Sequence, residues 1–284
     1  MQMVACCGKA YACSNVSACT DRAQLKTAVD DCVGAQSCAD AGIADWDVSA
    51  VTDMTQVFLS ATNFNANISR WDVGSVNFMN QMFYSATSFN GDLSGWDVGS
   101  VTGMYVMFNN AALFNGDVSG WDVSGVTTMH TMFQWAHRFN RDLSAGWDVG
   151  SVVDMSYMFN GASGFNGDIS GWDVGSVTHM QSLFRDVTNF SSDLSGWDVS
   201  GVTNMAQMFL YAGGFNSDLA GWNVGAVTTM SAMFTCSWAR PASPATSPAG
   251  TSAASSPPPI SAAVRPSSTR HAARSTPGTS RAPP

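Results

Sequence analysis

The sequence contains no glutamate, and it contains no proline before Pro241. All 21 acidic residues are therefore aspartates, and all of them precede the proline-containing tail. Lysine and arginine are scarce and scattered, which argues against a nucleic-acid partner, because phosphate contacts need clustered basic side chains. No apolar run is long enough to predict a membrane span, and the first residues lack the apolar core of a signal peptide. If the protein is secreted, we expect its leader to be missing from this chain.

Cysteine is also unevenly used. Six of the seven cysteines lie in the first 38 residues, and these disulfide candidates are Cys6, Cys7, Cys13, Cys19, Cys32 and Cys38. Such crowding in a short segment predicts a disulfide framework and an oxidising compartment. A zinc site is the alternative, but the spacings are poor for zinc and no histidine lies nearby.

What the sequence does contain is one unit repeated many times. Trp-Asp-Val begins at Trp46, Trp71, Trp96, Trp121, Trp147, Trp172 and Trp197, and Trp222 begins Trp-Asn-Val. Consecutive units are 25 residues apart, except for one inserted residue (Ala145 or Gly146) before Trp147. About eight units fill residues 46–238.

Each unit combines two apolar patterns. Alternation over Trp96, Asp97 and Val98 predicts a short strand with tryptophan and valine on one face. The 3, 4, 3 spacing of Val101, Met104, Phe108 and Ala111 predicts a short helix, and Thr residues such as Thr102 occupy its expected N-cap. Since neither element is stable alone, the sequence predicts an α/β repeat, an open solenoid of about eight strand-turn-helix coils.

The motif Leu-x-x-Trp-x-Val, as in 93–98, has the spacing of a leucine-rich repeat. The whole unit, followed by Val-Thr-x-Met-x-x-Met-Phe, resembles the BspA-type leucine-rich repeat surface proteins and the domain of unknown function of mycoplasma surface lipoproteins. The resemblance covers about residues 46–234. It implies an open leucine-rich-repeat-like solenoid, a cell-surface or secreted location, and binding or adhesion without catalysis.

In stacked coils, the aspartates after tryptophan form a column on one face, with neighbouring members about 4.8 Å apart. These candidate binding residues are Asp47, Asp72, Asp97, Asp122, Asp148, Asp173 and Asp198. A second column precedes the strand and runs from Asp92 to Asp218, with Asn67 in its first position. One interpretation is that the carboxylates cap backbone N–H groups, as Asn67 and Asn223 would. The other is a Ca²⁺ site, with Asp97, Asp122 and Asp148 as candidate ligands; we expect no other cofactor.

Other positions give weaker signals. Tyr84, Trp135 and Tyr211 depart from the consensus at places that stacking does not require, so they are candidate binding residues, either exposed or partly buried. A threonine column suggests ice binding only weakly. No catalytic motif is present, and the three histidines before the tail occupy different repeat positions, so we expect no enzymatic activity.

The expected organisation is a Cys-rich cap at 1–45 with one helix from about Asp21 to Val33, a repeat solenoid at 46–238, and a disordered Pro/Ser/Thr/Ala-rich tail at 239–284. The abrupt change of composition also fits an error of reading frame. We expect an extracellular or cell-surface protein whose acidic face binds a protein or glycan, as a monomer or in end-to-end association. The alternatives are a spacer without a specific ligand and a Ca-dependent or ice-binding surface protein.

Overall fold

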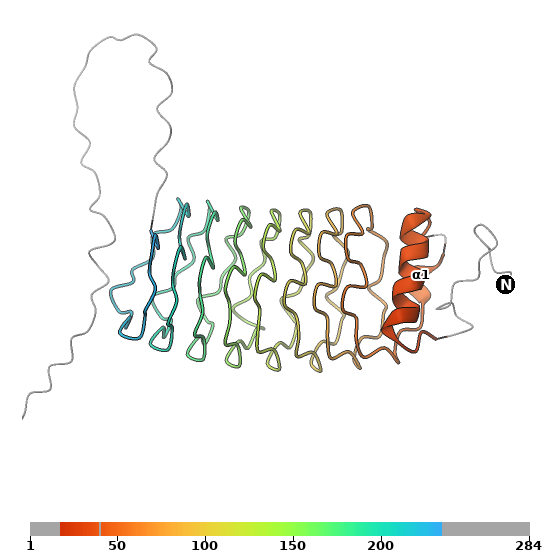
Figure 1. The fold of residues 1–284 in the computed structure, drawn as a ribbon, viewed down its shortest axis with the longest axis horizontal. Helices are drawn as coiled ribbons and strands as arrows, with labels where there is room; N and C mark the ends of the chain where they lie inside the picture. The colour runs from red at the N-terminus through yellow and green to blue at the C-terminus, as the bar shows by residue number, and fades with distance from the viewer. Residues whose placement is uncertain (1–17, 40, 235–284) are drawn as a thin grey trace, which may run out of the picture.

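A computed structural model describes residues 18–39 and 41–234 of the chain. One helix lies at one end, and the rest of the described chain winds into a row of similar coils stacked along one axis (Figure 1). The helix α1 spans Arg22–Gly34, and a short 3-10 helix, η2, spans Ile43–Asp45. Of the cysteine candidates, Cys6, Cys7 and Cys13 lie outside the described residues, as does the tail expected at 239–284.

Helix α1 covers the open end of the first coil. Its N-cap is Asp21, whose side chain accepts a hydrogen bond from the Gln24 N–H, as short polar side chains do at helix starts. The buried face of the helix belongs to the same apolar core as the coils, and it consists of Leu25, Ala28, Val29 and Cys32. At its end, Cys32 forms a disulfide with Cys38. Cys19 is buried and disulfide-bonded as well.

Successive coils are joined by hydrogen bonds between their main chains. In the first coil the N–H groups of Met54, Gln56, Phe58 and Ser60 donate to carbonyls of the next coil, 24 residues further on, at 2.7–3.1 Å. The pattern recurs along the row and includes isolated parallel bridges such as Asp53 with Phe78. Because alternate N–H groups point to the next coil, each coil depends on its neighbours for hydrogen bonding.

The remaining N–H groups of the same segment close turns within the coil. Val57 donates to Met54 and Ala61 to Phe58, and the third residue of each of these turns, Gln56 or Ser60, has a positive φ. These are the dihedrals of type II turns, which favour glycine or asparagine at that position. Here fifteen non-glycine residues of the described chain have positive φ.

The local elements of the repeat therefore differ from the expected strand and helix. Residues 46–234 contain no α-helix and no strand longer than an isolated bridge. The 3, 4, 3 spacing at Val101, Met104, Phe108 and Ala111 arises from consecutive turns, because a helix would use N–H groups that here bond to the next coil. Around Trp96 the expected alternation of burial is present, with Trp96 and Val98 buried and Asp97 exposed, but no ladder forms there.

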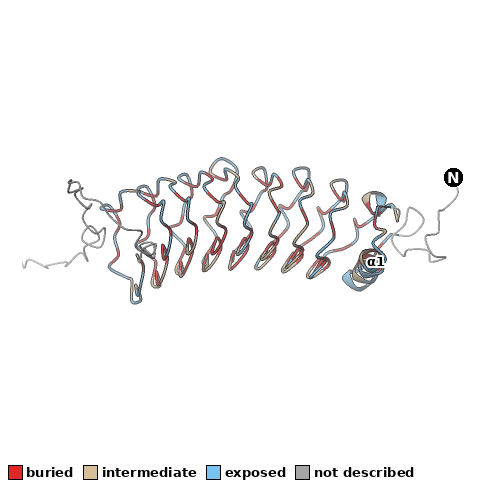
Figure 2. Ribbon diagram, turned by 90° about the horizontal axis from the view of Figure 1, so that it is seen from above, coloured by how far each residue is buried: buried red, intermediate tan, exposed pale blue. Residues whose placement is uncertain are grey.

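Aromatic side chains fill the interior of the row. Buried and exposed segments follow one another in the same order from coil to coil (Figure 2). Phe83, Phe108 and Phe133 stack almost parallel, with ring centroids 5.4 and 5.5 Å apart. A second phenylalanine column packs against the first within each coil, as Phe114 does on Phe108 at 4.0 Å. Offset stacking at these distances is favourable beyond the burial of area.

The repeated tryptophan is explained by its indole N–H. The Nε1 atom of Trp121 donates to the Leu93 carbonyl of the preceding coil at 3.1 Å, and Trp96 and Trp147 make the equivalent bonds to Ile68 and Val118. Each indole thus fills the core and also satisfies a buried carbonyl. A phenylalanine at this position would leave that carbonyl without its partner.

Replacing one ring of the inner stack should destabilise the whole row. We expect Phe133→Ala, at a fully buried position between Phe108 and Phe159, to lower the free energy of unfolding by about 3–5 kcal/mol. The matched control is Phe78→Ala, whose side chain is 47% exposed and should cost far less. Urea denaturation followed by circular dichroism measures both, and equal losses would contradict the assignment of the stack as the core.

Candidate functional site

The acidic column after tryptophan lies exposed along the row, and its carboxylates bind the backbone. In each coil the Oδ1 atom accepts from the N–H of the second residue after it, at 3.0–3.2 Å. The seven acceptors are Asp47, Asp72, Asp97, Asp122, Asp148, Asp173 and Asp198. Asn223 makes the same bond to Gly225. An amide can therefore replace the carboxylate, so this contact does not depend on charge.

The second acidic column repeats this geometry. Asp92, Asp117, Asp168 and Asp193 each accept from a serine N–H two residues on, and Asn67 does so for Ser69. Asp142 departs from the pattern and accepts from the Asp168 N–H of the next coil at 2.9 Å. Asp142 is the member that immediately precedes the inserted residue, and the insertion changes the turn there.

These hydrogen bonds favour the ionised carboxylates. The backbone N–H and the hydroxyl of Ser94 lower the pKa of Asp92, and the same groups of Ser119 and Ser170 lower the pKa of Asp117 and Asp168. In the first column the serine hydroxyl is the larger cause, and it lowers the pKa of Asp47, Asp122 and Asp198. Hydrogen bonds to the charged form have this effect on any carboxyl group.

The described residues contain no group of three His, Cys, Asp or Glu side chains placed to hold a metal ion. The Ca²⁺ site at Asp97, Asp122 and Asp148 stays a prediction. In the threonine column, the Thr178, Thr203 and Thr228 hydroxyls donate to backbone carbonyls of the preceding coil at 3.1–3.2 Å. These hydroxyls serve the contact between coils.

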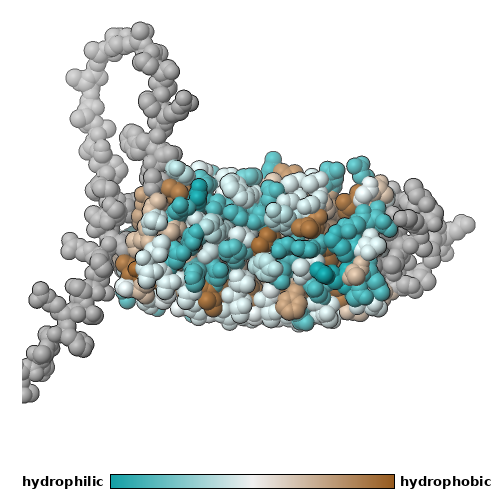
Figure 3. Space-filling view, in the orientation of Figure 1, coloured by the Kyte–Doolittle hydropathy of each residue, from teal (hydrophilic) through white to brown (hydrophobic). Residues whose placement is uncertain are grey.

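A different side of each coil carries the residues that vary. We define the turn face as the laddered segments 53–60, 78–85, 103–110, 128–135, 154–161, 179–186 and 204–211. In every segment the second, fifth and sixth residues are buried in the core. The other five differ from coil to coil and form columns along the row. The side of the molecule in Figure 3 is mainly hydrophilic, with hydrophobic residues in separate patches.

The three aromatic residues selected from the sequence lie on the turn face. Tyr84, Trp135 and Tyr211 are 36%, 42% and 39% exposed, so each is partly packed and partly accessible. Trp135 lies beside Gly161 of the next coil: a Cβ on Gly161 would lie 2.4 Å from its ring. Phe78 and Tyr105 are similarly exposed and were missed, because the sequence criterion considered only positions after Met-Phe.

The turn face also brings together polar groups that looked unrelated in the sequence. His130 Nδ1 lies 3.6 Å from Asp154 Oδ2, and its ring meets the Tyr157 ring edge to face at 5.8 Å. His179 contacts Thr178 Oγ1 through Nδ1 at 2.8 Å. The ladder offset of 24 residues would have found the His130–Asp154 pair, whereas the repeat period of 25 does not. This pair adjoins no nucleophile or metal group, and the expectation of no enzymatic activity stays a prediction.

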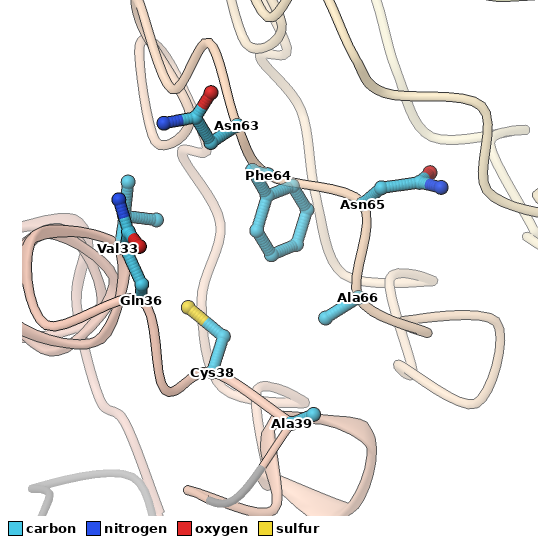
Figure 4. Close-up of a pocket in the computed structure, with 8 residues that line it drawn as sticks. All are labelled: Val33, Gln36, Cys38, Ala39, Asn63, Phe64, Asn65 and Ala66. Atoms are coloured by element: carbon cyan, nitrogen blue, oxygen red, sulfur yellow. The ribbon is translucent and has the colours of Figure 1, made fainter.

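A pocket of about 370 Å³ lies between the C-terminal end of α1 and the first coil. The Phe64 ring is directed into the space between these two parts of the chain (Figure 4). Val33 and Cys38 complete its apolar wall, and Gln36 and Asn65 lie at its rim. The pocket adjoins residue 40, which is outside the described chain, and we assign it no ligand.

Comparison with known families places the repeats. The model of the family described as "Mycoplasma protein of unknown function, DUF285" matches residues 24–146 and 144–242. The chain belongs to this family. The two matched segments meet at the inserted residue, where the repeat period changes. No curated protein and no solved structure matches the chain. Membership confirms the domain-of-unknown-function part of the resemblance, while the link to BspA proteins and to leucine-rich repeats stays a prediction.

Among the described residues, no helix is both long and apolar enough to cross a membrane. The only α-helix there is α1, which has 13 residues.

The lowered aspartate pKa values predict acid sensitivity. Above the ordinary value of 3.8, the ionised carboxylates of Asp92, Asp117 and Asp168 stabilise the fold, and this contribution is lost as the pH falls through their lower folded-state pKa. The triple variant D92N/D117N/D168N keeps an acceptor but cannot titrate. We expect its urea midpoint to fall less than that of the wild type between about pH 5 and about pH 2.

The three serines provide a graded comparison. Alanine at Ser94, Ser119 and Ser170 removes the hydroxyl bonds but keeps the backbone bonds, so the acid-induced loss of stability should be intermediate. If all three proteins lose stability in parallel, the carboxylate bonds do not stabilise the fold.

Proposed function

We propose that the chain is a non-enzymatic binding protein that works outside the cell, and that it binds its partner through the turn face. The Cys32–Cys38 disulfide supports the location, because such bonds persist in oxidising compartments. Location at a cell surface and a role in adhesion are part of this proposal.

The contrast between repeated and varied positions carries the proposal. Side chains that recur in every coil have a partner inside the stack: indoles bond to carbonyls, aspartates to turn N–H groups, and phenylalanines to each other. The five varied positions of the turn face are not required for that packing. They nonetheless carry half-exposed aromatic residues such as Tyr84, Tyr105 and Trp135. Exposed aromatic residues of this kind are enriched where proteins bind partners.

The backbone beneath these side chains is well suited to binding. Trp135 and Tyr211 sit at positive φ, and the N–H of Trp135 is bonded to the Asn160 carbonyl at 2.9 Å. A surface whose backbone is held on both sides loses little entropy when a partner arrives. We therefore regard the turn face as a pre-organised binding surface and assign the acidic columns mainly to turn structure.

A comparison of two variants tests which face binds. We expect Y84S/W135S/Y211S to lose most of its binding to an array of immobilised glycans and extracellular-matrix proteins, because it removes three exposed rings without touching the ladder. The matched variant D97N/D122N/D148N should bind like the wild type. The reverse result would move the site to the acidic face, and no binding by any protein would favour a spacer without a specific ligand.

A second candidate function has its own observation. Carboxylates of neighbouring coils approach the same glycine: a Cβ on Gly99 would lie 3.4 Å from both Asp97 Oδ1 and Asp122 Oδ2. Carboxylates from adjacent coils are thus close enough for one hard cation to contact both. This arrangement supports a proposal of Ca²⁺-dependent binding on the acidic face.

Thermal unfolding of the full chain distinguishes the two proposals. A cation that binds only the folded state must raise the melting temperature as its concentration rises. If Ca²⁺ binds this column, the melting temperature should rise with Ca²⁺ more than with Mg²⁺, fall back with chelator, and respond less in D97N/D122N/D148N. Identical melting curves in all conditions would remove the second candidate.

A further inference from the structure

The middle of the turn face differs from the rest of the molecule in having no formal charge. We define the uncharged patch as the varied positions of 78–85, 103–110 and 128–135. Its fifteen residues are Phe78, Asn80, Gln81, Tyr84, Ser85, Gly103, Tyr105, Val106, Asn109, Asn110, Thr128, His130, Thr131, Gln134 and Trp135. None is Asp, Lys or Arg, whereas the coils on either side contribute charged residues such as Asp53 and Asp154.

Four partly exposed aromatic rings are distributed over these three coils. Phe78 and Tyr84 belong to one coil, Tyr105 to the next and Trp135 to the third, with exposed fractions of 36–47%. A planar ring that shows one side to solvent offers an apolar surface to a ligand, and tyrosine and tryptophan add a polar edge. Adjacent hydrogen-bonded segments lie about 4.8 Å apart, so the rings recur at intervals comparable to the length of one sugar ring.

Amide side chains fill the space between the rings, and they are held by bonds between coils. Gln56 Nε2 donates to Gln81 Oε1 at 2.7 Å, Asn109 Nδ2 to Gln134 Oε1 at 2.9 Å, and Asn110 Nδ2 to Ser85 Oγ at 3.1 Å. An amide has two N–H donors and a carbonyl that can accept twice. One such bond fixes its orientation and leaves further donors and acceptors for a ligand.

Buried polar atoms without a partner also collect here. The side-chain atoms of this kind in the described chain are Asn80 Oδ1, His130 Nδ1, Thr131 Oγ1 and Asn160 Oδ1. The first three belong to the uncharged patch, and Asn160 lies in the adjoining coil. Buried polar groups are normally satisfied, so their concentration at this patch identifies a place where an added hydrogen-bonding group would be favourable.

From this combination we infer that the uncharged patch binds a neutral polysaccharide along the row of coils, an inference that rests on the proposed function of the turn face. Sugar rings present C–H faces that pack on aromatic rings and hydroxyl groups that pair with amides. An anionic polymer would find no cation in the patch and would be repelled by the acidic columns. A basic protein would be drawn to the aspartates instead, and the patch lacks the arginines typical of protein interfaces.

Native gel electrophoresis of the full chain through soluble polysaccharides tests the inference. The probes are the neutral polymers β-glucan, xylan and glucomannan and the anionic polymer alginate. We expect at least one neutral polymer to retard the protein and alginate not to do so. Tyr105→Ser and Trp135→Ser should each weaken that retardation about tenfold in affinity, because each removes one stacking ring.

The chain offers a matched control at the same repeat position. Tyr211 occupies the column of Trp135 and is 39% exposed, but it lies outside the patch, three coils further on. Tyr211→Ser should bind the polymer like the wild type, and unchanged urea midpoints would exclude unfolding as the cause of any loss.

The possible outcomes separate this inference from the proposed function. No retardation by any neutral polymer, stronger retardation by alginate, or equal effects of the three substitutions would overturn the polysaccharide assignment. If the immobilised array still showed binding to a protein that depends on Tyr84 and Trp135, the proposed function would stand without the polysaccharide. Loss of binding in both experiments would overturn both.

Discussion

The main-chain hydrogen bonds between coils are the constraint on which the rest of the structure depends. Met129, Thr131, Phe133 and Trp135 give their N–H groups to the coil of Asp154, and the same offset recurs along the row. Since each coil leaves these groups unsatisfied by itself, no coil is stable alone. The offset also fixes the side chains: a phenylalanine in one coil must lie over a phenylalanine in the next, and an indole must reach the carbonyl of the coil before it.

The ladder also holds the backbone in conformations that the side chains do not favour. Val106, Thr131 and Tyr157 adopt positive φ, which costs on the order of 1 kcal/mol or more for residues with a Cβ. The sequence pattern predicted repeated coils, the buried residues and the covering helix at about Asp21 to Val33, because period and burial are written in residue type. It did not predict the turns, because the glycine or asparagine that usually marks a type II turn is absent at most of these positions. Methionine and phenylalanine at helical spacing were therefore read as a helix.

The same division applies to the candidate sites. The turn-capping role of the aspartates was predictable, because Asn67 and Asn223 stand in the same columns and can make the same bond. Tyr84, Trp135 and Tyr211 were identifiable as departures from a consensus. The His130–Asp154 approach and the amide contacts across coils were not, because they depend on an offset that only the backbone defines. Periodicity alone assigns residues to columns, whereas contacts between columns require the ladder geometry.

The inserted residue before Trp147 shows how structure and binding can be separated in this fold. The insertion alters the turn at Asp142, whose carboxylate binds Asp168 of the next coil instead of its own serine. Trp147 still reaches the Val118 carbonyl at 2.8 Å and stacks on Trp172 at 6.1 Å, and the ladder from Met129 to Trp135 continues unchanged. A disturbance at the acidic corner thus stays local because the ladder and the aromatic stacks lie elsewhere in the coil. By the same reasoning, the five varied positions of the turn face can be exchanged coil by coil without disturbing the stack, which is the property that a surface specialised for different partners needs.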